Sequence, residues 1–207
     1  MGFYNLLNKL KPHQIFIYAS SSSVYSGQYG AKETSDKFES HNMYDLSKFS
    51  MDCLARIHPF PLNFYSLRFG TVNGVSPQMR EDLIVNAMVK SALTKNMITV
   101  TNGHNYRPIL WIRDLARAVN TIIQQALPER SGIYNLCSFN DTIENIALSI
   151  GRILSCPVEI KEGGSPAYDF SITADKFEKG FNFKFEGSIE KVVNELLIYY
   201  RKEKKCV

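Results

Sequence analysis

The spacing of apolar residues alternates along the chain between the helical period and short unbroken runs. Apolar positions three or four residues apart predict helices at 3–11, 43–57, 81–96, 112–127, 142–155 and 188–204. Apolar runs bounded by polar segments predict strands at 14–20, 62–70, 97–103, 131–138 and 158–164. Strands separated by helices of this length imply right-handed crossovers, so the pattern predicts an α/β fold with a helix-covered parallel sheet.

Four consecutive serines, Ser20 to Ser23, follow the first predicted strand. Functional groups of an open parallel sheet gather just beyond the carboxyl ends of its strands. The hydroxyls therefore either face a ligand crevice or form a turn or helix cap, and the four residues taken alone favour the cap.

Tyr44 and Lys48 stand four residues apart on the predicted helix 43–57, so they share one face. Taken alone, the pair is typical of a surface tyrosine packed over a lysine stem. After a strand and a serine cluster, however, the tyrosine phenol and a serine hydroxyl can meet at one substrate hydroxyl. A nearby ammonium would lower the pKa of the tyrosine from its usual value of about 10, which supplies a general base. The apolar stripe of this helix comprises Leu46, Phe49, Cys53, Leu54 and Ile57.

Composition narrows the class of protein. The 207 residues are 44% hydrophobic and 21% charged, as expected for one large soluble domain or two interleaved ones. The net charge of +4 arises largely in the tail 201–207, where a solvated helix end is expected rather than a nucleic-acid site. No apolar run approaches the roughly 20 residues that span a bilayer, so no membrane partner is expected. The four cysteines are scattered without a C-x-x-C pair, which predicts reduced thiols, a cytoplasmic location and no metal site.

Four motifs in order resemble one family. They are IYASSSSVYSG (17–27), YDLSK (44–48), LRFGTVNGVSPQMREDLIVN (67–86) and YRPILWIRDLARAV (106–119). Together they resemble an extended short-chain dehydrogenase/reductase of the NAD-dependent sugar-nucleotide epimerase/dehydratase family. The resemblance implies the C-terminal part of a Rossmann-type parallel sheet with a small α/β substrate-binding lobe. It also implies NAD as cofactor and a sugar nucleotide as substrate.

Matching positions carry the family's catalytic roles onto this chain. Ser21 resembles the serine that hydrogen-bonds the reacting sugar hydroxyl, and Tyr44 resembles the catalytic base. Lys48 resembles the lysine that holds the nicotinamide ribose and tunes the tyrosine. Phe69 falls where the family packs against the nicotinamide.

Other matching positions imply contacts with the substrate. Ser22 and Thr71 fall beside the sugar, and Asn86 or Asp82 falls near the sugar or its phosphates. Arg107 resembles the arginine that grips the diphosphate, although its position alone favours a structural or surface arginine. Asp114 is expected to be structural, as a cap of its helix.

The sequence departs from the family pattern at two places, one that concerns NAD binding and one that concerns the substrate phosphates. The family begins with a strand and a glycine-rich G-x-x-G-x-x-G turn that holds the NAD pyrophosphate, and this sequence has no such turn. By resemblance, roughly the first hundred family residues are missing here, so the isolated chain is expected to bind NAD no better than roughly millimolar and to lose activity on that account. The segment 163–176 also lacks a second phosphate-binding arginine, and its nearest cations are Lys161 and Lys176.

Two functions follow from these observations. One is an NAD-dependent epimerase that works through a transient keto sugar, without loss of water, because Ser22 and Ser23 occupy the positions of the acidic pair of dehydratases. The alternative is a truncated remnant or split-gene half that binds sugar nucleotides or a protein partner. The expected partners are a second copy, paired through the Tyr44 helix, or a chain that supplies the missing half. The resemblance divides the chain into an NAD-binding part, 1–74 and 105–137, and a sugar-nucleotide lobe, 75–104 and 138–207.

Overall fold

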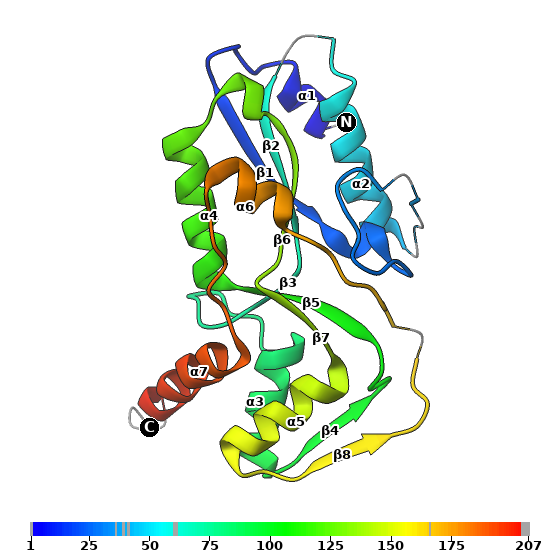
Figure 1. The fold of residues 1–207 in the computed structure, drawn as a ribbon, viewed down its shortest axis with the longest axis vertical. Helices are drawn as coiled ribbons and strands as arrows, with labels where there is room; N and C mark the ends of the chain where they lie inside the picture. Colours follow the sequence, from blue (N-terminus) through cyan, green and yellow to red (C-terminus); the bar gives the residue numbers. More distant parts are fainter. Residues whose placement is uncertain are drawn as a thin grey trace.

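The central element of the fold is a three-stranded parallel sheet. A computed structural model describes residues 2–35, 37–38, 40, 42–59, 62–165 and 167–203. The sheet has the order β1-β2-β6 and is formed by β1 (Ile15–Ser21), β2 (Asn63–Phe69) and β6 (Gly132–Leu136) (Figure 1). Ser21 pairs with Phe69, and Phe69 pairs with Leu136. The carboxyl ends of all three strands therefore lie level at one edge of the sheet.

Two smaller sheets extend the molecule below this edge in Figure 1. The first has the order β3-β5-β7 and consists of β3 (Thr71–Asn73), β5 (Tyr106–Trp111) and β7 (Phe139–Thr142). The second pairs β4 (Ile98–Thr101) with β8 (Val158–Lys161) in parallel. The β5–β7 pair is antiparallel. The sequence pattern predicted none of the strands β3, β5 and β7, and β7 (FNDT) in particular is short and mostly polar and gives no strand signal.

The helices form two groups. In Figure 1, α1 and α2 lie on one side of the central sheet, with α4 and α6 on the other, whereas α3, α5 and α7 belong to the lower half. The bounds are α1 (Gly2–Leu7), α2 (Met43–Arg56), α3 (Ile84–Lys95), α4 (Ile112–Gln125), α5 (Ile143–Leu154), α6 (Asp175–Phe181) and α7 (Ile189–Glu203). Every predicted helix range overlaps one of these helices, and α1 begins one residue before its predicted range and ends at Leu7 rather than at residue 11. The seven-residue α6 was not predicted, since it is too short to show a clear period.

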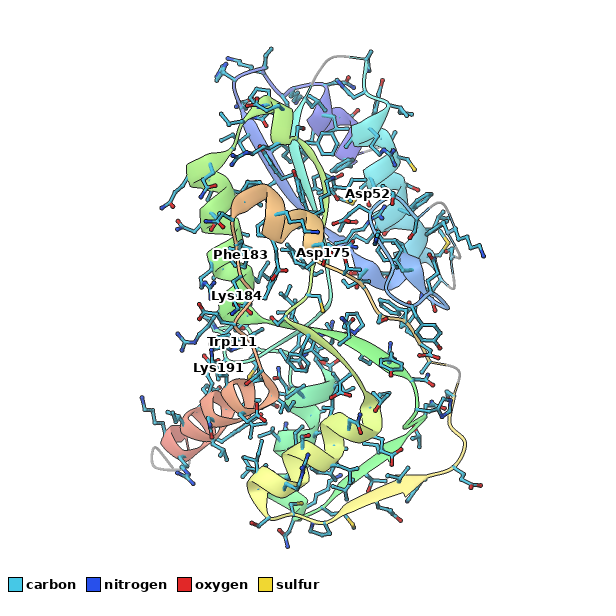
Figure 2. The ribbon with its side chains drawn as sticks, viewed as in Figure 1. Asp52, Trp111, Asp175, Phe183, Lys184 and Lys191 are labelled. Atoms are coloured by element: carbon cyan, nitrogen blue, oxygen red, sulfur yellow. The ribbon has the colours of Figure 1, made fainter. Side chains whose placement is uncertain are left out.

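The hydrophobic core follows the same division. One cluster of buried side chains surrounds Tyr65 and Leu110 under the central sheet, and another surrounds Val89, Ile146 and Leu196 between α3, α5 and α7. Phe177 and Phe181 of α6 pack in the first cluster, under the central sheet. The family resemblance assigns residues 138–207, which include α6, to the sugar-nucleotide lobe. The chain after β8 therefore returns to the central sheet before it enters α7. Lys191 lies over the Trp111 ring at the start of α7 (Figure 2).

Helix α2 is anchored to the sheet by polar groups. Its buried residues are Asp45, Asp52 and Ala55, whereas Leu46 and Ile57 of the apolar stripe are exposed. The Asp52 carboxylate accepts hydrogen bonds from four side chains of the sheet: Tyr18 Oη (3.2 Å), Ser20 Oγ (3.1 Å), Ser66 Oγ (2.5 Å) and Arg68 Nε (2.8 Å). A buried carboxylate needs such compensation, because desolvation of the charge is otherwise costly.

Cysteines and membrane segments add little to the architecture. Cys53, Cys137 and Cys156 are free thiols, and Cys206 and the rest of the tail 204–207 lie outside the described residues. Within the described ranges, no helix is long and apolar enough to cross a membrane, and no three metal-binding side chains gather.

Candidate functional site

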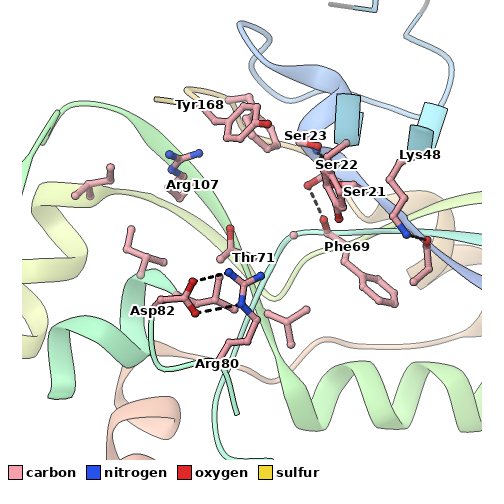
Figure 3. A pocket seen from close by; sticks show the side chains of 18 of the residues that line it. Ser21, Ser22, Ser23, Lys48, Phe69, Thr71, Arg80, Asp82, Arg107 and Tyr168 are labelled. Carbon is pink, nitrogen blue, oxygen red and sulfur yellow. Dashed lines mark hydrogen bonds and ion pairs between the residues drawn. The ribbon is translucent and has the colours of Figure 1, made fainter. Parts of the chain in front are cut away.

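A cavity of about 780 Å³ opens at the carboxyl ends of β1 and β2. Its position is the one expected for ligands of open α/β sheets, and its volume suits a small-molecule ligand. Figure 3 shows Arg107 and Tyr168 on one side, Lys48 and Phe69 on the other, and the serines between them. The residues predicted from the sequence that line it are Ser21, Ser22, Tyr44, Lys48, Phe69, Thr71, Asp82 and Arg107.

The serine cluster both caps a turn and faces the cavity. Ser21 ends β1 in extended backbone, and its Oγ accepts a hydrogen bond from the Ser23 amide (3.2 Å) at the start of the 3-10 turn Ser22–Tyr25. Ser22 Oγ donates to the Phe69 carbonyl (2.7 Å), which joins the ends of the two neighbouring strands. The two interpretations of the serine run are therefore compatible, because all four serines also line the cavity.

A buried carboxylate sets the direction of the hydroxyl hydrogen bonds. Ser23 Oγ donates to Asp45 Oδ1 at 2.6 Å, since an ionised carboxylate only accepts. Ser23 has one hydroxyl proton, so Ser21 Oγ, 2.8 Å away, must be the donor in the pair that these two serines form. The Ser21 proton is therefore directed to Ser23, and a ligand oxygen in the cavity would compete with Ser23 for it. Asp45 itself is fully buried behind the serines.

Tyr168 links the same carboxylate to Arg107. The Tyr168 hydroxyl lies 3.0 Å from both oxygens of Asp45 and accepts a hydrogen bond from Asn42 Nδ2 (2.6 Å). Asn42 is also the N-cap of α2, where its Oδ1 accepts from the Asp45 amide (3.0 Å). The Arg107 guanidinium lies 5.5 Å from the centre of the Tyr168 ring. Burial lowers the pKa of Arg107 from its usual value, with partial compensation from Asp169, yet arginine stays charged in proteins.

Tyr44 and Lys48 stand on the first turns of α2 and both line the cavity. The Lys48 ammonium donates to the Ala19 carbonyl (2.8 Å) and lies 5.7 Å from the centre of the Tyr44 ring. Tyr44 is 55% exposed, so its phenol is open to a ligand that enters the cavity. The lysine is thus fixed by β1, whereas the tyrosine is free to meet a substrate.

Arg80 is a cavity residue that the sequence interpretation did not include. Its guanidinium forms a two-point ion pair with Asp82, through Nε to Oδ1 (3.1 Å) and Nη2 to Oδ2 (2.5 Å), as Figure 3 shows. Both side chains are about two-thirds exposed, at 66% and 67%, and both line the cavity. The available signal was the Arg-x-Asp spacing in the loop before α3.

Two predicted residues serve the scaffold. Asn86 is buried and is absent from the cavity lining; its Oδ1 accepts from the Gly74 amide (3.0 Å) and its Nδ2 donates to the Arg80 carbonyl (2.9 Å). It therefore holds the loop that carries Arg80 and Asp82. Asp114 is buried and accepts from Ser138 Oγ (2.7 Å) and the Gly187 amide (2.7 Å). It is structural as expected, but it joins the chain before α7 rather than capping its own helix, whose N-cap is Trp111.

Comparisons with known proteins agree with this geometry. The NAD dependent epimerase/dehydratase family matches residues 1–137. A relative from Bacillus subtilis (strain 168), the uncharacterized UDP-glucose epimerase YtcB, is 26% identical over 123 residues, which are 57% of this chain and 38% of YtcB. The chain therefore spans well under half the length of this relative.

Solved structures share the fold. UDP-glucuronic acid 4-epimerase from Bacillus cereus, in complex with UDP-glucuronic acid and NAD, matches 96% of this chain and 65% of its own at 19% identity, with a TM-score of 0.81. L-threonine dehydrogenase from Phytophthora infestans matches 98% of this chain and 70% of its own at 20% identity, with a TM-score of 0.82. The fold is thus the Rossmann-type α/β fold that the sequence predicted. Since the family match covers residues 1–137 of 207, the chain belongs to the NAD-dependent epimerase/dehydratase family.

Proposed function

We propose that the chain carries the sugar-nucleotide site and catalytic residues of an NAD-dependent sugar-nucleotide epimerase. The observation that supports this most is the shared cavity, in which Ser21 and Lys48 lie toward one end and Arg107 toward the other. Tyr44 also lines it, with the centre of its ring 5.7 Å from the Lys48 ammonium. A sugar nucleotide has the matching polarity, with a neutral sugar to be oxidised and an anionic diphosphate. The solved epimerase from Bacillus cereus is named with such a ligand.

The residues at the Lys48 end fit the nicotinamide side of NAD. Lys48 offers an ammonium for ribose hydroxyls, and Phe69 offers an aromatic ring beside it in the cavity wall. When bound, NAD supplies the reversible oxidation of the sugar carbon. The protein holds the reacting groups in place. In this proposal the sugar hydroxyl gives its one proton to Tyr44 as general base, and Ser21 donates its own proton to the sugar oxygen in place of its bond to Ser23.

Arg107 is the proposed diphosphate ligand. Its guanidinium is held over the Tyr168 ring at 5.5 Å, and no ion pair with a carboxylate is found for it in the described part of the chain. A planar fork of donors that is free of a carboxylate suits two phosphate oxygens. Arg80 is available as a second ligand if a substrate anion replaces Asp82. Asn86 has no part in this proposal, because its amide is committed to the backbone.

The cavity wall favours epimerisation over loss of water. Expulsion of a hydroxyl needs a carboxylic acid near the neighbouring carbon, and Ser22 and Ser23 cannot supply one. Among the described residues that line the cavity, the one carboxyl group belongs to Asp82, which is paired with Arg80. Asp45 is close to the serines but lies behind them, outside the lining.

The apolar stripe of α2 supports pairing with a second copy of the chain. Met43, Leu46 and Ile57 follow the helical period on one face, and they are exposed by 77%, 42% and 75%. Exposed apolar residues gathered on one face often mark a protein interface. In this proposal the chain is cytoplasmic and binds its sugar nucleotide within a homodimer.

A binding experiment followed by a turnover assay tests the function. Calorimetry with UDP-sugars should show binding to the chain that weakens about tenfold or more in Arg107→Gln, since a charge-assisted hydrogen bond contributes about 1.5–3 kcal/mol. With NAD in millimolar excess, because the sequence has no glycine-rich turn for its pyrophosphate, NMR of the sugar should show exchange between the two epimers at one carbon. Tyr44→Phe should slow this exchange by about 10²–10⁴ while binding is retained.

The outcomes separate the enzyme from the alternative. Binding without turnover, in the presence of NAD, would favour a sugar-nucleotide-binding module. Absence of sugar-nucleotide binding would reject the enzyme and the sugar-nucleotide-binding module, and would leave a module that binds a protein partner. A stable product lighter by one water, seen by mass spectrometry, would contradict epimerisation.

A further inference from the structure

A second cavity, of about 510 Å³, lies at the other end of the central sheet. Phe64 near the start of β2 and Gly132 and Ile133 at the start of β6 contribute to its wall. Phe69 lines the cavity described above, which is called the main cavity from here on. Phe64 stands five positions earlier on the same strand, a distance of roughly 16 Å at the usual rise of a strand. The two cavities are therefore distinct, and the function proposed above gives the second one no role.

Positive charge dominates the second cavity. Four cations line it, Lys32, Arg56, Lys176 and Lys179, against the two carboxylates of Glu33 and Asp175. Lys179 lies 3.5 Å from Asp175, and Glu33 Oε1 accepts from the Asn135 amide (2.7 Å). Neither Lys32 nor Arg56 forms an ion pair within the described residues. The excess of cations is available to an anion from outside.

Lys176 is held in the cavity wall. Its ammonium donates to the Ile133 carbonyl (2.7 Å) and lies 4.4 Å from the centre of the Tyr134 ring. Burial lowers the pKa of Lys176 from its usual value; Glu33 opposes this shift, and Arg56 adds to it. Figure 2 marks this wall by Asp175 at the start of α6. Arg56 and Lys176 line the same cavity and repel each other, and a bound anion would relieve the repulsion.

The remaining wall indicates an organic anion. Phe64 and Ile133 provide apolar surface, and Thr34 and Thr173 provide hydroxyls. We propose that this second cavity binds a phosphorylated small molecule of the size of a nucleoside monophosphate. Its phosphate lies between Arg56 and Lys176, and its ring lies against Phe64. Guanidinium and ammonium groups are the usual phosphate ligands, and an aromatic face suits a planar base.

Amide NMR on the full chain tests the proposal, with AMP, adenosine and inorganic phosphate as probes. AMP should shift the amides of 32–34, 132–133 and 173–179, and it should bind about tenfold or more tightly than either adenosine or phosphate. Higher salt should weaken the binding of AMP. Equal binding of AMP and adenosine, or of AMP and phosphate, would overturn the proposal. So would shifts confined to the main cavity.

Charge-matched variants complete the test. Arg56→Gln/Lys176→Gln should weaken AMP binding at least about tenfold, whereas Lys95→Gln/Arg152→Gln, which removes the same charge from α3 and α5, should change it less than about twofold. An equal loss in both would show diffuse surface attraction and reject the site. Because Lys176 also holds the Ile133 carbonyl, Arg56→Gln alone should keep the melting temperature and still weaken binding. Arg107→Gln should leave AMP binding at this site unchanged, which keeps the result independent of the sugar-nucleotide proposal.

Discussion

Helices α2 and α5 bury opposite kinds of surface. Helix α5 turns Ile143, Ile146, Ala147 and Ile150 into the core against α3 and α7. Helix α2 turns Asp45 and Asp52 toward the sheet and leaves Leu46 and Ile57 of its apolar stripe exposed, while Phe49 is half-buried. Non-directional packing holds α5, whereas directional hydrogen bonds hold α2. A fully satisfied polar network fixes one arrangement, so the helix that carries Tyr44 and Lys48 is the one whose rotation is most tightly set.

The largest effect is expected from breaking the network at Asp52. Asp52→Ala leaves Arg68 buried without its carboxylate, and removal of one partner of a buried ion pair typically costs about 3–5 kcal/mol. Urea denaturation should show this loss in the free energy of unfolding. Arg80→Gln, in the exposed pair with Asp82, is the control and should leave the midpoint nearly unchanged. A loss below about 1 kcal/mol for Asp52→Ala would mean that the network does not anchor α2.

Shortening one buried side chain of α5 should lower the free energy of unfolding slightly less than Asp52→Ala, and it should leave the main cavity undisturbed. Ile146→Ala opens a cavity in the lower core, with an expected loss of about 2–5 kcal/mol. The amide NMR signals of the main cavity at Ser21 and Lys48 should stay in place, because packing around α5 does not set the rotation of α2. If those signals moved as far as they do in a folded Asp52 variant, packing around α5 would also set the position of α2, and the two helices would not be held independently.

The same contrast explains what the sequence could predict. The apolar period of α5 identified both the helix and its buried face. For α2 the period identified the helix, but not its orientation, because an apolar stripe looks the same whether it meets a core or a partner chain. Asp45 and Asp52 share a helix face, yet their partners Ser23, Ser66 and Arg68 are distant in sequence.

The site shows a similar limit. Strand ends and helix spacing, which are local properties, brought Ser21, Tyr44 and Lys48 together, and the family resemblance added Arg107; all four line one cavity. Tyr168 and Arg80 were missed, since each reaches the cavity from a loop with no periodic pattern. The sequence offered Asn86 or Asp82 as a substrate contact, and only Asp82 lines the cavity. The two residues lie about one helical turn apart, and a sequence motif alone does not show which of them faces the cavity.

A smaller effect is expected at Asp45. Asp45→Asn removes the charge that accepts from Ser23 and Tyr168, with an expected loss of about 1–3 kcal/mol. Burial is the main cause that raises the pKa of Tyr168, and Asp45 raises it further. The variant should therefore lower the pKa of Tyr168, as measured by NMR of tyrosine labelled at Cζ. An unchanged Tyr168 pKa would show that the carboxylate does not act on this hydroxyl.

The smallest effect on stability is expected on the outer face of α2, and it tests the contrast most directly. Leu46→Lys/Ile57→Lys changes exposed side chains that support no core, so the free energy of unfolding should stay within about 0.5 kcal/mol for each substitution. If this face pairs two copies of the chain, sedimentation should show a dimer for the parent and a monomer for the variant, because buried lysines in an apolar interface lack partners. Leu148→Lys, at a similarly exposed position on α5, is the matched control and should leave the dimer intact. A monomeric parent chain, or equal dissociation in both variants, would mean that α2 exposes its apolar stripe for a reason other than pairing with itself.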